Sequence, residues 1–96
     1  MSDYRGNAIA MISAERERQV SAERYGPYHD DQHTGGTLAK AAAVYALPER
    51  YRGAINYPSG WRFKPSPHNR IRELVKAGAL IVAEIERLQR KARGAS

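Results

Sequence analysis

The stretch "SPHNRIRELVKAGALIVAEIERLQRKARG", residues 66–94, decides the fold because it predicts one long amphipathic helix. Ser66 followed by Pro67 is typical of a helix start. Apolar or small residues then recur at spacings of three and four, and these are Ile71, Leu74, Gly78, Ile81, Ile85 and Leu88. The basic last turns and Gly94 favour an end there. We therefore expect a helix over about 67–92.

This helix is longer than a domain of this size needs to cover its own core. The spacing of its apolar seam is close to a heptad repeat, which is typical of helices that pair with another helix. Gly78 lies inside the seam and costs about 1 kcal/mol of helix propensity relative to alanine, so we expect a close helix crossing there. The sequence therefore predicts at least a dimer, with oligomerisation through the C-terminal helix.

An earlier segment, residues 7–24, also predicts a helix. We expect Ile9, Ile12 and Val20 on its inner side and the "ERER" segment, residues 15–18, mostly in solvent. The glycine and proline of "YGPY" break the pattern and end this helix.

A further helix is predicted over about 37–47, with Thr37 as the expected N-cap and Pro48 at its end. Its expected inner face consists of Leu38, Ala41, Ala42 and Tyr45. The fold class is therefore mainly α, with three helices in a single small helical domain over residues 1–96. We expect a long ordered loop over 48–66, with a short helix at its start or a small hairpin.

The composition excludes several classes of protein. The chain has 96 residues and no cysteine, so neither disulfides nor thiolate zinc sites are available. Its apolar stretches fall well short of the roughly 20 residues that span a membrane. We therefore expect a cytoplasmic protein, neither secreted nor integral to a membrane.

The net charge of +6 is concentrated in one part of the chain. Residues 40–76 contain eight basic and two acidic side chains, while the charges of the two flanks cancel. Such a block indicates an anionic partner, which could be nucleic acid, a nucleotide or an acidic protein face. The alternative is that it offsets the acidic N-terminal third within an oligomer.

The stretch "YGPYHDDQHTGG", residues 25–36, gathers side chains that bind metals in other proteins, namely His29, Asp30, Asp31 and His33. Glycines and prolines bracket them, which argues against a regular helix. Three interpretations stay open. The cluster is a metal site, or its aspartates cap a turn and pair with arginines of the basic block, or its histidines contact the polar part of a ligand.

The predicted loop alternates basic and aromatic side chains, in "RYR" at 50–52 and "WRFK" at 61–64. Arginines bind phosphate through paired hydrogen bonds and aromatic faces stack on bases, although arginines also snorkel over small cores. The candidate ligand-binding residues are Arg50, Tyr51, Arg52, Tyr57, Trp61, Arg62, Phe63, Lys64 and Arg70, with His29 and His33 as contacts to ribose or base. We assign no catalytic residue, metal or cofactor. A DNA-recognition helix is not apparent.

The blocks "ISAERERQ", "YHDDQHTGGTLAKAAAVYAL", "WRFKP" and "RELVKAGALIVAEIERLQR" resemble a family of small proteins of unknown function from tailed phages and prophages. The resemblance implies a phage origin and a role in the host-cell cytoplasm, but no activity. A fainter similarity links "ERERQ" and "GPYHDDQH" to the all-helical nucleoside triphosphate pyrophosphohydrolases. Those enzymes hold magnesium on paired glutamates, whereas "TLAKAAAVYAL" has no carboxylate. That similarity implies a helical shape without the metal chemistry.

Together these observations favour a homo-oligomer that binds an anionic, nucleotide-like molecule and does not turn it over. The expected role is that of a phage counter-defence protein, not an enzyme, which sequesters a nucleotide-type immune signal. One alternative is an anti-CRISPR-like inhibitor that binds a bacterial defence complex. The other is a metal-dependent nucleotide hydrolase built on "HDDQH".

Overall fold

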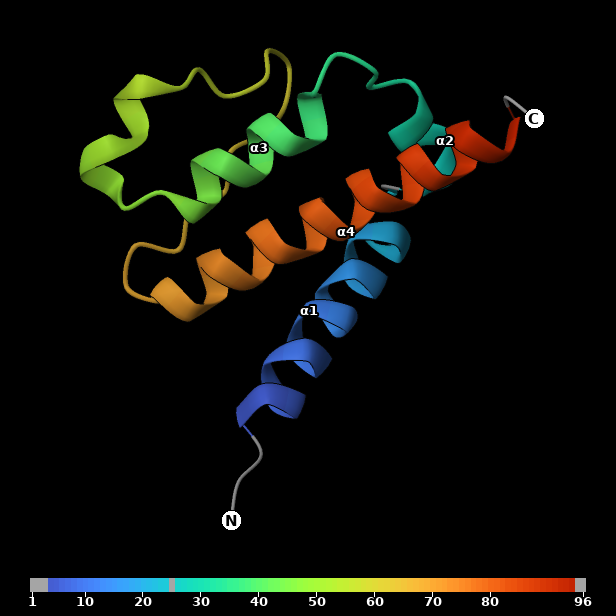
Figure 1. The fold of residues 1–96 in the computed structure, drawn as a ribbon. Helices are drawn as coiled ribbons and strands as arrows, with labels where there is room; N and C mark the ends of the chain where they lie inside the picture. Colours follow the sequence, from blue (N-terminus) through green and yellow to red (C-terminus); the bar gives the residue numbers. More distant parts are fainter. Residues whose placement is uncertain (1–3, 25, 95–96) are drawn as a thin grey trace.

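The computed structural model describes residues 4–24 and 26–94, and this part of the chain is mainly helical and contains no strand (Figure 1). Its helices are α1 (Tyr4–Ser21), α2 (Pro27–Asp31), α3 (Thr37–Ala46), the 3-10 helix η1 (Glu49–Ala54) and α4 (Arg70–Gly94). The mainly α prediction is confirmed, and η1 is the short helix expected at the start of the long loop. None of the described helices is both long enough and apolar enough to cross a membrane.

Helices α1, α2 and α3 all pack against helix α4. Helices α1 and α3 lie on different sides of it, and α2 lies beside its C-terminal half (Figure 1). Helix α1 crosses α4 near its middle, and the N-terminal half of α1 projects away from the rest of the molecule. Residues 5–11 of that half are all exposed.

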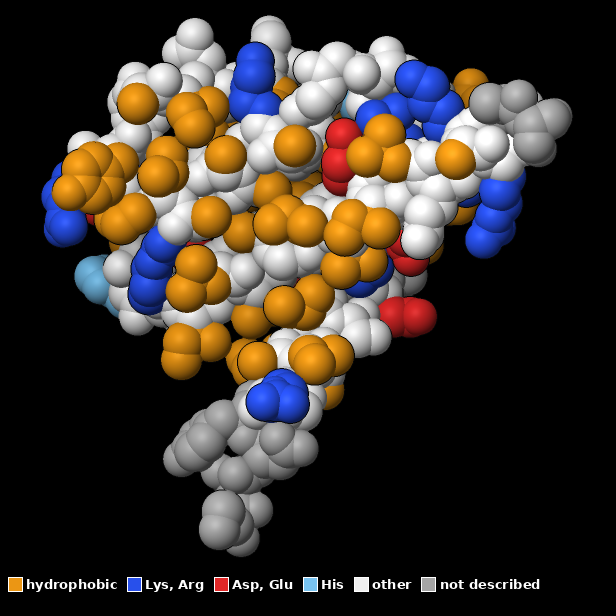
Figure 2. Space-filling view, in the orientation of Figure 1, with side chains coloured by type: hydrophobic (Ala, Val, Ile, Leu, Met, Phe, Trp, Pro, Cys, Tyr) orange, Lys and Arg blue, Asp and Glu red, His pale blue; other side chains and the backbone are white. Residues whose placement is uncertain are grey.

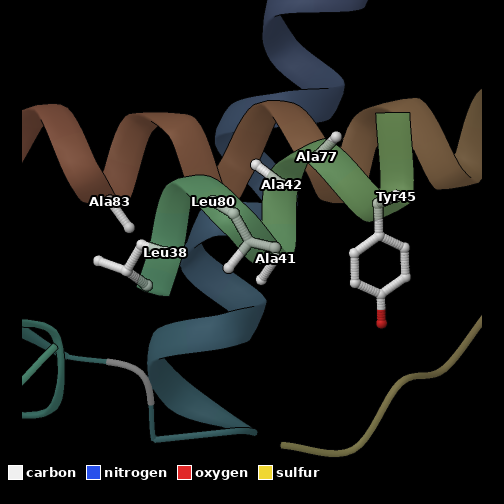
Figure 3. Packing of buried hydrophobic residues seen from close by; sticks show 7 residues of the cluster. All are labelled: Leu38, Ala41, Ala42, Tyr45, Ala77, Leu80 and Ala83. Carbon is white, nitrogen blue, oxygen red and sulfur yellow. The ribbon is translucent and has the colours of Figure 1, made fainter. Parts of the chain in front are cut away.

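The core lies between α3 and α4 and is built largely from small side chains. Its buried members are Leu38, Ala41, Ala42 and Tyr45 from α3 and Ala77, Leu80 and Ala83 from α4 (Figure 3). The predicted inner face of α3 is therefore confirmed. The ring of Tyr45 projects from the helix pair toward the loop, where Tyr57, Trp61 and Phe63 pack against the core.

The start of α4 differs from the prediction. The helix begins at Arg70, and the side chain of Asn69 accepts a hydrogen bond of 3.0 Å from the backbone N–H of Arg72, as an N-cap residue does. Ser66 is not the cap. Its backbone N–H instead donates to the Glu73 carboxylate at 3.0 Å.

The start of α3 differs in the same way. Its N-cap is Gly36, whose φ of 80° lies in the left-handed region that glycine tolerates, and Thr37 is the first helical residue. Thr37 is therefore not the cap that was expected.

The predicted seam of α4 does not face the core. Helices α1 and α3 cover Val75, Ala79, Leu80 and Ala83, whereas all five large seam residues are exposed. Their exposed fractions are 64% for Ile71, 46% for Leu74, 48% for Ile81, 51% for Ile85 and 49% for Leu88. The reason is that α4 has apolar residues on several sides. Helices α1 and α3 pack beside the large seam residues, which therefore stay exposed.

The inner side of α1 was predicted only in part. Ile12 is half-buried and faces Gly78 of α4, whereas Ile9 and Val20 are exposed and Glu15, Arg16 and Gln19 are buried. These polar residues are tolerated because they have partners, such as Arg72 of α4, which donates to Glu15 at 2.5 Å.

The close crossing expected at Gly78 is present. A Cβ atom at this position would lie 2.7 Å from Cδ1 of Ile12 in α1. A side chain at this position would therefore require the side chain of Ile12 to move.

Candidate functional site

The acidic-histidine cluster begins in helix α2, where no regular helix was expected. The prolines and glycines around the cluster had argued against a helix. Pro27 is compatible with one because it lies in the first turn of α2, where a proline loses no hydrogen bond. Asp30 is fully buried and accepts a hydrogen bond of 2.7 Å from Nη2 of Arg16. Nδ1 of His29 lies 3.0 Å from its other oxygen.

The neighbouring Asp31 faces α4, where Nη2 of Arg90 donates to it at 2.8 Å. The two aspartates therefore pair with arginines of α1 and α4 and not with the basic block at 40–76. Within residues 4–24 and 26–94, no three histidine, aspartate or glutamate side chains are grouped closely enough to hold a metal ion.

The two histidines instead lie against Trp61. The ring centroids of His29 and His33 are 4.6 Å apart, and they lie 5.5 and 4.9 Å from the indole. Burial lowers the pKa of His33, the charge of His29 lowers it further, and Asp30 acts in the opposite sense. The carboxylate of Asp30 therefore only partly offsets burial and His29, which both favour the neutral form of His33.

A hollow of about 240 Å³ opens beside His33 and Trp61. Its other lining residues are Gly35, Thr37, Lys40, Pro58 and Ser59. Thr37 begins α3, so the positive end of this helix and the Lys40 ammonium both border the hollow.

Two of the predicted phosphate-binding arginines bind the end of α3. Arg52 donates to the carbonyl oxygens of Val44 and Tyr45 at 2.8 and 3.2 Å. Arg70 donates to the carbonyl oxygens of Tyr45, Ala46 and Leu47. These contacts satisfy carbonyl groups that a helix end leaves without an intrahelical partner.

Both arginines also bind the buried Glu73, at 3.0 Å from Arg52 and 3.2 Å from Arg70. Burial acts to raise the pKa of Glu73, but the hydrogen bonds from Arg52, the Ser66 amide and Arg70 outweigh it and lower the pKa. Arg52 and Arg70 thus have a clear structural role in joining α3 to α4.

Four other candidate ligand-binding residues lie either in the interior or in η1. The rings of Tyr57 and Phe63 lie 6.0 and 5.0 Å from Tyr45 and help to close the core. In η1, the guanidinium of Arg50 lies 4.7 Å from the ring of Tyr51. Neither Arg50 nor Tyr51 lines the spaces beside Trp61.

A second space beside Trp61, which we call the Trp61 cleft, lies between α1, α3, α4 and the loop. It is lined by Glu15, Arg18, Gln19, Glu23, Tyr45, Tyr57, Trp61, Arg62, Lys64, Lys76 and Leu80. Its enclosed volume is about 30 Å³, enough for one small polar group. Four candidate residues meet here, namely Tyr57, Trp61, Arg62 and Lys64, whereas Gln19 and Lys76 were not predicted.

Gln19 is the polar residue that distinguishes this cleft. It is 4% exposed, and its Nε2 donates to Glu15 at 3.1 Å. Its carbonyl oxygen Oε1 is buried and has no hydrogen-bond partner in the part of the chain that the structure describes. A buried acceptor without a donor costs about 1–3 kcal/mol, so this atom marks a place for a donor from a water molecule or a ligand.

Two lysines contribute positive charge to the cleft. Lys64 pairs with Glu23 at 2.8 Å, and Nζ of Lys76 donates to the carbonyl oxygen of Lys64 at 2.7 Å. Burial lowers the pKa of Lys76, and the positive charge of Arg72 lowers it further. The cleft therefore combines a buried acceptor, aromatic rings and ammonium groups.

No protein-family model, curated protein or solved structure matches this chain. Its chemistry therefore has to follow from its own residues.

The sequence did contain a signal for Gln19, which lies one helical turn after Glu15 on the same side of α1. The apolar residues of α1 suggested a different inner face, and Glu15 was expected mostly in solvent with the rest of the "ERER" segment.

Proposed function

We propose that the chain binds an anionic, nucleotide-type molecule at the Trp61 cleft, with one polar group of that molecule inside the cleft, and does not turn it over. The observation that carries this proposal is the buried Oε1 of Gln19, which accepts no hydrogen bond from the residues that the structure describes. An amino or amide group of a nucleobase is small enough to fit the enclosed volume, and its N–H can donate a hydrogen bond to this oxygen.

The side chains around Gln19 support a base with attached phosphate. Trp61 and Tyr57 offer aromatic surface on which a base can stack. Arg62, Lys64 and Lys76 line the same cleft, where Lys64 pairs with Glu23, and Arg62 and Lys76 complement negative charge. The hollow beside His33 and Lys40 shares Trp61 with the cleft and provides room for a second part of an extended molecule.

Binding without turnover is supported by the state of the buried carboxylates. Glu15 and Glu73 each bind at least one arginine. Such pairing favours the charged form of a carboxylate and opposes proton transfer to it near pH 7.

The biological role that we propose is the one implied by the resemblance to small phage proteins, namely sequestration of a nucleotide-type immune signal in the host cytoplasm. Sequestration requires that the bound molecule stay intact and leave slowly.

The experiment uses the single tryptophan of the chain as its reporter. The fluorescence of Trp61 is followed during titration with cyclic dinucleotides and ADP-ribose derivatives. We expect one member of the panel to change the emission, and we expect Gln19→Leu to weaken its binding about tenfold or more, because the N–H then faces a methyl group. Gln89→Leu, on the exposed surface of α4, is the control and should bind normally.

The bound molecule is then released by heat and identified by mass spectrometry. Recovery of the intact molecule supports sequestration, and recovery of a degraded product would show an enzyme. The absence of binding across the panel, or equal binding by Gln19→Leu, contradicts the proposed site.

A further inference from the structure

The exposed side of α4 carries a continuous apolar surface, which we call the seam face. It consists of Ile71, Leu74, Ile81, Ile85 and Leu88, which are each 46–64% exposed. Figure 2 shows hydrophobic side chains gathered along α4 and continuing onto α1. Single exposed apolar residues are ordinary on protein surfaces, but a row of five on one helix is not.

The helices packed on α4 leave the five large residues of this side exposed. Ile12 of α1 packs against Gly78, which lies among them, and α3 packs on the side of Ala77 and Leu80. Within residues 4–24 and 26–94, no other helix covers the seam face.

Helix α1 extends the apolar surface beyond α4. Ile9 and Met11 are 62% and 37% exposed on its projecting half. A groove of about 410 Å³ runs between the two helices and is lined by Ile9, Ile12, Ser13, Arg16, Glu17, Val82 and Glu86. The groove thus has an apolar lining with charged residues of both signs among it.

The size of the seam face indicates an interface. A fully exposed leucine or isoleucine has an accessible surface of about 200 Å², so five half-exposed residues present on the order of 500 Å² of accessible surface. This area is close to the upper limit of the largest apolar patch on a typical monomer. Two such faces together, with the projecting half of α1, approach the roughly 1,200–2,000 Å² of a stable protein interface.

We infer that a second copy of this chain covers the seam face, in a two-fold symmetric dimer in which α1 and α4 of one copy meet α1 and α4 of the other. The near-heptad spacing of the seam favours a helix as the occupant. A two-fold interface brings the same patch of both copies together, so the patch must be complementary to itself. The seam face supplies apolar surface, and the groove supplies charges of both signs that can pair with each other across the interface. This inference does not depend on ligand binding.

The test is the mass of the protein in solution, measured by sedimentation or light scattering over a range of concentrations. We expect twice the chain mass of 10.7 kDa for the natural sequence. Ile85→Glu should produce a monomer, because it places a charge in the buried interface. Tyr51→Glu is the matched control, since Tyr51 is 52% exposed and Ile85 is 51% exposed, and this control should stay dimeric.

Circular dichroism shows whether Ile85→Glu retains its helices. If it does not, the double variant Ile81→Ala with Ile85→Ala replaces it, and we expect the dimer dissociation constant to rise by about tenfold or more. A monomeric natural sequence, or a dimer that the substitutions in the seam leave unchanged, overturns the inference.

Discussion

At the scale of single residues, Asp30 and Asp31 show how neighbouring carboxylates acquire different roles. Asp30 is fully buried against Arg16, whereas Asp31 meets Arg90 at the surface. A buried charge depends on its partner because it has lost its hydration, whereas water readily replaces a partner at the surface.

We predict that Asp30→Asn lowers the free energy of unfolding by about 3 kcal/mol, because it removes the carboxylate that neutralises Arg16 inside the protein. Asp31→Asn is the control and should leave stability almost unchanged. Urea denaturation at pH 7 measures both. Equal losses for the two variants would show that Asp30 is not buried as described.

These residues also show what the sequence could not predict at this scale. The pattern "HDDQH" left open a metal site, turn capping with pairing to arginines of the basic block, or ligand contact, whereas the aspartates pair with Arg16 and Arg90 outside that block. Which aspartate turns inward depends on the rotation of α2 against α1 and α4, and no local pattern encodes that rotation. The pairing of the aspartates with distant arginines was unpredictable for the same reason.

At the scale of elements, the N-terminus of α4 depends on Asn69. Its side chain accepts the hydrogen bond from Arg72 that was expected for Ser66. We predict that Asn69→Ala lowers the free energy of unfolding by about 1 kcal/mol through loss of the cap. Ser66→Ala should change it by less than about 0.5 kcal/mol, because only the backbone of Ser66 binds Glu73. Thermal or urea denaturation of the two variants distinguishes these outcomes, and a larger loss for Ser66→Ala would place the cap at Ser66.

The crossing of α1 and α4 depends on Gly78 and Ile12. In a helix, Gly→Ala normally stabilises by about 1 kcal/mol, but here the added carbon would lie 2.7 Å from Ile12. We predict that Gly78→Ala fails to stabilise the natural sequence and stabilises Ile12→Ala by about 1 kcal/mol. A double-mutant cycle in urea measures this difference. The full gain in the natural sequence would contradict the close contact.

The elements were easier to predict than their packing. Apolar periodicity correctly placed α1, α3 and α4 to within a few residues. It could not select the buried face of α4, because this helix has apolar residues on more sides than its own chain covers. It also missed the inner face of α1, where Glu15, Arg16 and Gln19 are buried through partners distant in the sequence.

At the scale of the whole molecule, carboxylate pairing makes stability depend on pH. Burial acts to raise the pKa values of Glu15 and Glu73, but hydrogen bonds from arginines outweigh it, and both pKa values lie below the ordinary 4.5. The folded protein therefore binds these protons less readily than the unfolded chain does. Their contribution to stability is complete above pH 4.5 and is lost as the pH falls through the lowered values.

We predict that the free energy of unfolding, measured by urea denaturation from pH 7 down to pH 3, decreases below about pH 4.5. Glu73→Gln should lower stability at pH 7 and reduce this decrease, because one of the linked carboxylates is gone. Glu17→Gln, at an exposed position on α1, serves as the control and should keep the pH dependence of the natural sequence. An unchanged pH profile for Glu73→Gln would contradict the linkage.

The arginines that bind the end of α3 have a consequence for folding. Arg52 and Arg70 reach the same carbonyl groups from positions after the helix, and Arg70 belongs to α4. The last turn of α3 is therefore completed only when η1 and α4 have reached their places. Because Glu73 holds both arginines together, α3, η1 and α4 form one cooperative unit, and its unfolding should appear as a single transition.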